Sequence, residues 1–128
     1  MSLALGGGLI EAAPMDIYHI WCDLGPGESD VAFADSVATW LDSMVAAGVL
    51  ARWRMTRRKL GLGDGGEFHL MLEFEGLAQL DEAFGSVAAR KDPVESLHHA
   101  VNSKVTNVRF SLYRDFPDDV RHRGDEKF

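Results

Sequence analysis

The chain has 128 residues, 46% of them hydrophobic, and a net charge of −7 at neutral pH. This length supports one domain with a single core, and so apolar a composition with three tryptophans excludes a disordered chain. The negative charge disfavours nucleic acid and anionic membranes as partners, no apolar run could cross a bilayer, and Cys22, the single cysteine, predicts a cytoplasmic protein without disulfides.

The first predicted elements are a strand and a helix. Residues 1–14 are rich in small side chains, and we treat them as an N-terminal extension, either a cloning remnant or a misplaced start. Residues 15–23 alternate apolar with polar side chains, which predicts a strand. After a Gly-Pro-Gly turn, Ser29 can cap a helix whose apolar residues recur at helical spacing as far as Gly48.

The remaining elements follow in the order strand, strand, helix, helix, strand. A glycine-rich segment between the two consecutive strands predicts a hairpin, and Pro93 follows Asp92 where the last helix begins. A polar tail, residues 117–128, ends the chain, so the domain is expected to cover residues 15–116. These strands are expected at residues 50–60, 67–75 and 104–114, and these helices at residues 77–88 and 92–102.

This order, βαββαβ, predicts an α+β ferredoxin-like fold with the helices on one face of an antiparallel sheet. Right-handed crossovers give the strand order 4-1-3-2, with the first and third strands at the centre. Alternation along these two strands then leaves His19, Trp21, His69, Met71 and Glu73 on the uncovered face. We expect any functional site on that face.

Five segments of the chain resemble an uncharacterised bacterial group: MDIYHIW, RRKLGLG, GEFH, DPVESLHHAVN and LYRDFP. This group belongs to the dimeric α+β barrel superfamily, which includes stress-responsive A/B barrel proteins and antibiotic-biosynthesis monooxygenase-like proteins. The resemblance covers about residues 15–117 and implies a homodimer whose two sheets pack face to face around a cavity. The superfamily includes cofactor-free oxygenases, isomerases, haem enzymes and proteins without an assigned activity. The resemblance carries over no catalytic residues, because this sequence matches none of their catalytic sets position by position.

The residues themselves also predict self-association. A monomer would leave Trp21, Met71 and Tyr113 on a solvated sheet face, and an exposed apolar patch of this kind usually marks an interface or a pocket.

The same order of elements describes RNA-recognition domains. Those domains carry aromatic residues on the open face of the third strand, where this chain has His69, Met71 and Glu73, so we expect no nucleic-acid partner.

His19 and His69 are the candidate catalytic residues, because histidine titrates near neutrality and can act as a general base. The alternative is that both pack in the dimer interface as hydrogen-bonded structural residues. We expect no metal, since His69 and Glu73 lie roughly 13 Å apart on a strand and cannot share an ion. No other cofactor is expected.

Other side chains could bind a substrate in the cavity between the sheets. Arg54 and Arg109 could bind an anion through paired hydrogen bonds. The alternative for Arg54 is that its strand lies at the sheet edge, where its cations are solvated and prevent edge pairing. Trp21 and Tyr113 could hold an aromatic ligand or pack in the dimer core, and His98 could line the cavity mouth or pack beside its helix. The predicted substrate-binding residues are Trp21, Arg54, Met71, Glu73, His98, Arg109 and Tyr113.

Two functions fit this sequence. The first is a homodimeric barrel that binds a small aromatic or anionic molecule, with His19 or His69 as the base of a cofactor-independent monooxygenase-like or isomerase-like enzyme. The second is a non-catalytic dimer with a stress-responsive or regulatory role, in which side chains fill the barrel centre. A cavity of about 300 Å³ or more that reaches both histidines favours the first function.

Overall fold

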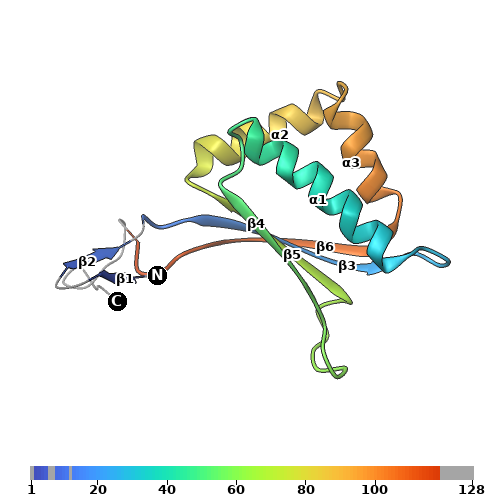
Figure 1. The fold of residues 1–128 in the computed structure, drawn as a ribbon, viewed down its shortest axis with the longest axis horizontal. Helices are drawn as coiled ribbons and strands as arrows, with labels where there is room; N and C mark the ends of the chain where they lie inside the picture. Colours follow the sequence, from blue (N-terminus) through green and yellow to red (C-terminus); the bar gives the residue numbers. More distant parts are fainter. Residues whose placement is uncertain (1, 6–7, 12, 119–128) are drawn as a thin grey trace.

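The computed structural model describes residues 2–5, 8–11 and 13–118, and its main sheet has four antiparallel strands. A short hairpin precedes this sheet, in the segment that the sequence placed outside the domain, and Figure 1 shows it beyond the end of the sheet. The elements are β1 (Ser2–Leu5), β2 (Gly8–Glu11), β3 (Asp16–Leu24), α1 (Asp30–Ala46), β4 (Arg52–Arg57), β5 (Phe68–Phe74), α2 (Leu77–Ala88), α3 (Val94–Asn102) and β6 (Val105–Arg114).

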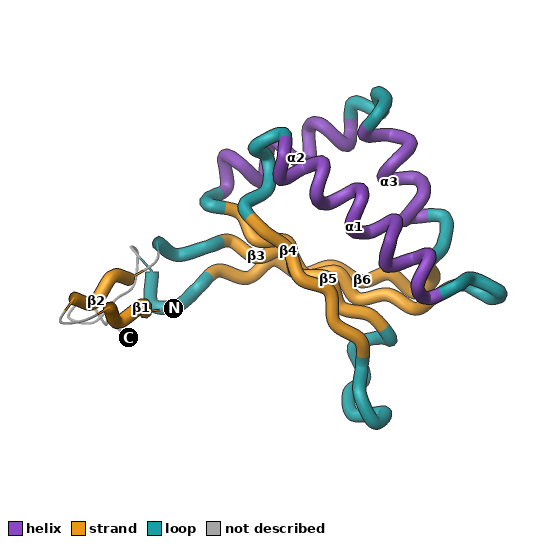
Figure 2. Tube along the Cα trace, viewed as in Figure 1, coloured by secondary structure: helices purple, strands orange, loops and turns teal. Residues whose placement is uncertain are grey.

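The strand order of the main sheet is β4-β5-β3-β6, which confirms the predicted order when it is read from the other edge. All three helices lie on one side of the sheet (Figures 1 and 2), so the predicted two-layer α+β architecture is also confirmed. No helix of the described part of the chain lies over the opposite sheet face. Among the described residues, no helix has the length and hydropathy that crossing a membrane requires.

Local signals explain where the first elements begin and end. Ser29 caps α1 because its Oγ accepts the backbone N–H of Ala32 at 3.2 Å. Gly48, with a φ of +77°, lets the chain leave this helix in the left-handed region. β4 is shorter than predicted, because the chain turns at Leu60 and Gly61, which both have positive φ.

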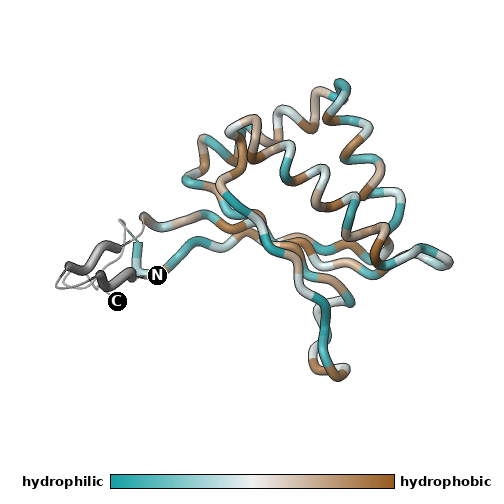
Figure 3. The backbone as a smooth tube through the Cα atoms, in the orientation of Figure 1, coloured by the Kyte–Doolittle hydropathy of each residue, from teal (hydrophilic) through white to brown (hydrophobic). Residues whose placement is uncertain are grey.

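The core lies between the sheet and α1. Alternate residues of β5 are buried under the helices, as the sequence predicted, and α1 contributes a buried stripe of apolar side chains. Hydrophobic and hydrophilic residues alternate along strands and helices (Figure 3), as expected for elements with one buried face. The largest fully buried side chains are Phe33, Val37, Leu41, Leu50, Leu70 and Phe74.

An ion pair between a buried aspartate and a partly exposed arginine joins the central strand β3 to the edge strand β6 at the end of the sheet. Asp16 on β3 is only 3% exposed, and its Oδ1 accepts the Arg114 Nε–H of β6 at 2.7 Å. Next to this pair, the backbone N–H of Asp115 donates to the Met15 carbonyl, and the N–H of Met15 donates to the Asp115 carboxylate. These contacts hold β3 and β6 in register at this end of the sheet.

Candidate functional site

The open face of the sheet presents side chains from all four strands in cross-strand rows. The strand register places Met71 of β5 opposite His19 of β3, and His69 of β5 opposite Trp21. Sequence alternation therefore predicted the composition of this face well, since the five residues expected there lie there. Two of its rows are Arg54–Met71–His19–Ser111 and Thr56–His69–Trp21–Arg109.

His19 and His69 form a direct contact at the centre of this face. His19 Nδ1 lies 2.8 Å from His69 Nε2, so the N–H of one imidazole donates a hydrogen bond to the bare ring nitrogen of the other. The two rings stack on each other and on Trp21, and Tyr113 meets His19 edge-on at 5.0 Å between ring centroids. Partial burial lowers the pKa of both imidazoles, and the neighbouring His19 adds to the lowering for His69, so both are mainly neutral at pH 7.

The charged residues that were predicted to bind a substrate differ in the partners that they already have. Arg109 donates from one terminal nitrogen to the backbone carbonyls of Asp64 and Gly65, so it holds the β4–β5 loop against the open face. Glu73 accepts from Arg52 on the neighbouring strand, at 2.9 Å in an ion pair. Arg54 is exposed and makes no ion pair or side-chain hydrogen bond with any described residue.

The glycines of the β4–β5 loop allow it to approach Trp21 closely. A Cβ on Gly65 would lie 2.9 Å from the indole ring, and Gly66 has a φ of +131°. Beside this contact is an open hollow of about 440 Å³, lined by Trp21, Gly65, Arg109, Phe110 and Ser111. The lining of this hollow includes neither His19 nor His69, although Trp21 stacks on both imidazoles.

A second cavity lies on the other side of the sheet, beneath the helices. This helix-side cavity has a volume of about 370 Å³ and a mainly apolar lining. Its walls come from β3, β5, β6, α1, α2 and α3, so most of the domain shapes it. The lining includes Tyr18, Ile20, Trp40, Leu72, Phe84, Val87, His98 and Phe110.

Three aromatic rings form one wall of the helix-side cavity. Tyr18 meets Phe84 edge-on at 5.1 Å and stacks on Phe110 at 5.6 Å between centroids. Phe84 is 44% exposed and Phe110 57% exposed, although both face the helix-side cavity. Burial raises the pKa of the Tyr18 phenol. Apolar rings left in water at the rim of a cavity are typical of a surface that a ligand or partner covers.

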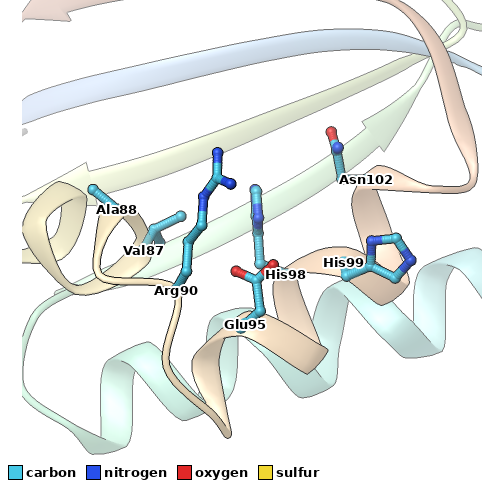
Figure 4. Close-up of a pocket in the computed structure, with 7 residues that line it drawn as sticks. All are labelled: Val87, Ala88, Arg90, Glu95, His98, His99 and Asn102. Carbon is cyan, nitrogen blue, oxygen red and sulfur yellow. The ribbon is translucent and has the colours of Figure 1, made fainter.

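His98, which was predicted at the mouth of the cavity between the two sheets or as a packing residue of its helix, lies on the helix side of the sheet at the junction of several hollows. Its imidazole is 5.1 Å from the Trp40 ring, and it lines both the helix-side cavity and an adjoining polar hollow of about 360 Å³. Burial lowers the pKa of His98, against the opposing effect of Glu95. Figure 4 shows the polar hollow, which is lined by Val87, Ala88, Arg90, Glu95, His98, His99 and Asn102.

Sequence reasoning missed most of the helix-side cavity. Periodicity along β3 and α2 reports only the side on which Tyr18 and Phe84 lie, and it does not show that the packing there is incomplete. The indole N–H of Trp40 is buried without an acceptor among the described residues, another sign of imperfect packing in this region. The available signal was His98, a polar residue beside the apolar stripe of a short helix.

Several solved structures share this fold. SnoaB from Streptomyces nogalater is described as a cofactor-independent oxygenase, and the solved protein is a mutant. Its sequence is 9% identical to this chain, the TM-score is 0.60, and the match covers 84% of this chain and 100% of the SnoaB chain. A hydroxynitrile lyase from Passiflora edulis is 12% identical with a TM-score of 0.62, covering 79% and 93%. A dimeric ferredoxin-like protein of unknown function from Thermobifida fusca is 12% identical with a TM-score of 0.54, covering 79% and 91%.

These similarities confirm the predicted fold, and at such low identity they extend to the fold alone. No curated protein matches the sequence. A family of unknown function, DUF6614, matches residues 15–128, which is most of the chain.

Proposed function

We propose that this chain, which belongs to the family of unknown function DUF6614, is a homodimer that binds a small, largely apolar molecule in the helix-side cavity. The observation that carries the proposal is the cavity itself, about 370 Å³ of mainly apolar space with half-exposed Phe84 and Phe110 at its rim. This volume lies within the range of small-molecule sites. Two proteins with this fold are described as a cofactor-independent oxygenase and a hydroxynitrile lyase, so enzymes that act on small molecules occur among proteins with this fold.

The proposed dimer covers the open face of the sheet with a second copy of the chain. Tyr113 on this face is 60% exposed, and Trp21 and Met71 lie on the same face. Burying such side chains against a partner removes apolar surface from water, which is the main favourable term in association. Several proteins that share the fold are described as dimeric, which supports this arrangement.

Binding in the helix-side cavity can be tested with N-phenyl-1-naphthylamine, a neutral aromatic probe that becomes fluorescent in apolar surroundings. The wild-type chain should bind it saturably. Val87→Trp should abolish binding, because Val87 lines the cavity and a bulky ring would fill it. Glu82→Trp places the same ring at an exposed position of the same helix and should bind like wild type. Equal binding by both variants would contradict the proposed location.

A second candidate function rests on the contact between His19 and His69. Two neutral imidazoles joined by a 2.8 Å hydrogen bond can relay a proton, and the outer nitrogen of the pair can then act as a general base. Arg54, exposed on the neighbouring strand, would hold a substrate anion in the cavity between two sheets. The chain would then be a cofactor-independent enzyme acting at the dimer interface.

The double variant His19→Ala/His69→Ala separates this function from a packing role. An interfacial enzyme loses ligand binding or turnover in this variant but still sediments as a dimer in analytical ultracentrifugation. If the variant dissociates while still binding the naphthylamine probe, the imidazoles are packing residues of the interface. That result would favour the non-catalytic alternative, in which side chains fill the barrel centre.

A further inference from the structure

We infer that the ligand of the helix-side cavity is an amphipathic acid, with an apolar body against Tyr18 and Phe110 and an anionic group held by Arg90. This inference rests on the proposed function and names the chemical class of its ligand. It comes from the polar hollow beside the cavity, which the binding proposal leaves unused.

The polar hollow and the helix-side cavity adjoin each other. Val87, Ala88 and His98 line both, so a molecule in the cavity meets the hollow at these residues. The cavity lining is mainly apolar, whereas the hollow is lined largely by charged, imidazole and amide side chains. A ligand that occupied both spaces would therefore be apolar at one end and polar at the other.

Hydrogen-bond donors dominate the polar hollow. Arg90, His98, His99 and Asn102 all carry N–H groups, whereas Glu95 is the only carboxylate in its lining among the described residues. Figure 4 shows Arg90 and His98 projecting in the same direction from their backbones, with His99 turned away from them. A carboxylate or a similar oxyanion matches such a donor set, because guanidinium forms paired, charge-assisted hydrogen bonds with it.

The backbone of Arg90 gives an independent reason to assign its side chain a role. Arg90 follows the C-cap residue Ala89 of α2 and has a φ of +52°, in the left-handed region that favours glycine. Its backbone N–H donates to the Val87 carbonyl, an interaction that glycine would keep. Its guanidinium makes no ion pair or hydrogen bond with any described residue. The arginine therefore occupies a strained position without an internal partner for its charge.

A matched pair of probes tests this inference: 1-naphthaleneacetic acid and its neutral amide, each used to displace N-phenyl-1-naphthylamine at neutral pH. The acid should bind the wild-type chain about ten-fold more tightly than the amide, the factor expected for one hydrogen bond to a charged group. This preference should shrink as salt is added, because Arg90 is exposed.

Two variants assign the preference to Arg90. Arg90→Gly should remove the preference for the acid and keep the affinity for the amide, while its unfolding temperature stays equal or rises because glycine suits the left-handed backbone. Glu95→Gln removes the opposing carboxylate from the same hollow and should strengthen acid binding without changing the affinity for the amide, whereas weaker acid binding by this variant would contradict the inference.

Equal binding of acid and amide to the wild-type chain would overturn the inference and leave the proposed function standing. A lower unfolding temperature for Arg90→Gly, with acid and amide weakened equally, would also overturn it, because Arg90 would then be a structural residue. Failure of N-phenyl-1-naphthylamine itself to bind would instead refute the proposed function.

Discussion

Phe84 should behave as a cavity wall and not as a core residue, and its replacement by alanine tests this directly. Replacing a fully buried phenylalanine by alanine costs about 3–5 kcal/mol of the free energy of unfolding. Phe84 is 44% exposed, so a little over half of that loss applies, and the space left by the ring opens to solvent. We therefore expect Phe84→Ala to lose about 2 kcal/mol, including its edge contact with Tyr18.

Phe33→Ala is the matched control, since Phe33 is wholly buried and should lose about 3–5 kcal/mol. Urea unfolding followed by far-UV circular dichroism gives both free energies. Binding of N-phenyl-1-naphthylamine to Phe84→Ala should also weaken, by about five-fold for the loss of roughly 1 kcal/mol of apolar contact. A loss as large as that of Phe33→Ala, or unchanged probe affinity, would show that Phe84 packs in a closed core and would refute the cavity.

Three further predictions concern other parts of the domain. Asp16→Asn should lower the free energy of unfolding by about 2 kcal/mol, because it leaves the guanidinium of Arg114 facing a buried neutral amide. Urea titrations measure this change, and a value near zero would show that the ion pair does not stabilise the fold. The pKa values of His19 and His69 are lower in the folded chain than in the unfolded chain, so the unfolded chain takes up protons more readily. The free energy of unfolding should therefore fall as the pH drops below about 6.5, and it should fall less steeply in the double variant His19→Asn/His69→Asn. Parallel plots of this free energy against pH for the two chains would contradict the prediction. Cys22 is buried and its pKa is raised to about 11, so a thiol reagent should modify it only in urea, and rapid modification of the folded chain would contradict the burial.

The sheet was predictable because two strong rules govern it. Alternation decided which side of β3 carries His19 and Trp21, and the handedness of crossovers placed β3 beside β5. That His19 and His69 share the open face of two neighbouring strands follows from these two rules. Their contact could not be predicted, because a two-residue shift in register would keep both on this face and still change the distance between their rings.

The helix-side cavity was not predictable for a physical reason. Periodicity reports the direction in which Phe84 and Phe110 point, but not how completely the helices cover them. That coverage depends on where α2 and α3 sit above the sheet, which is decided by many small packing contacts. The left-handed backbone of Arg90 was hidden for a similar reason, since arginine gives no local signal for it.

Consecutive residues of β3 belong to different environments, and this has an evolutionary consequence. Tyr18 and Ile20 line the helix-side cavity, whereas His19 and Trp21 lie on the opposite face. If the chain binds a ligand on one face and self-associates through the other, as proposed, substitutions at even and odd positions of this short segment can be selected separately. One set would change the bound molecule and the other would change how copies associate. A lineage with this strand could then diversify its chemistry without rebuilding its quaternary structure.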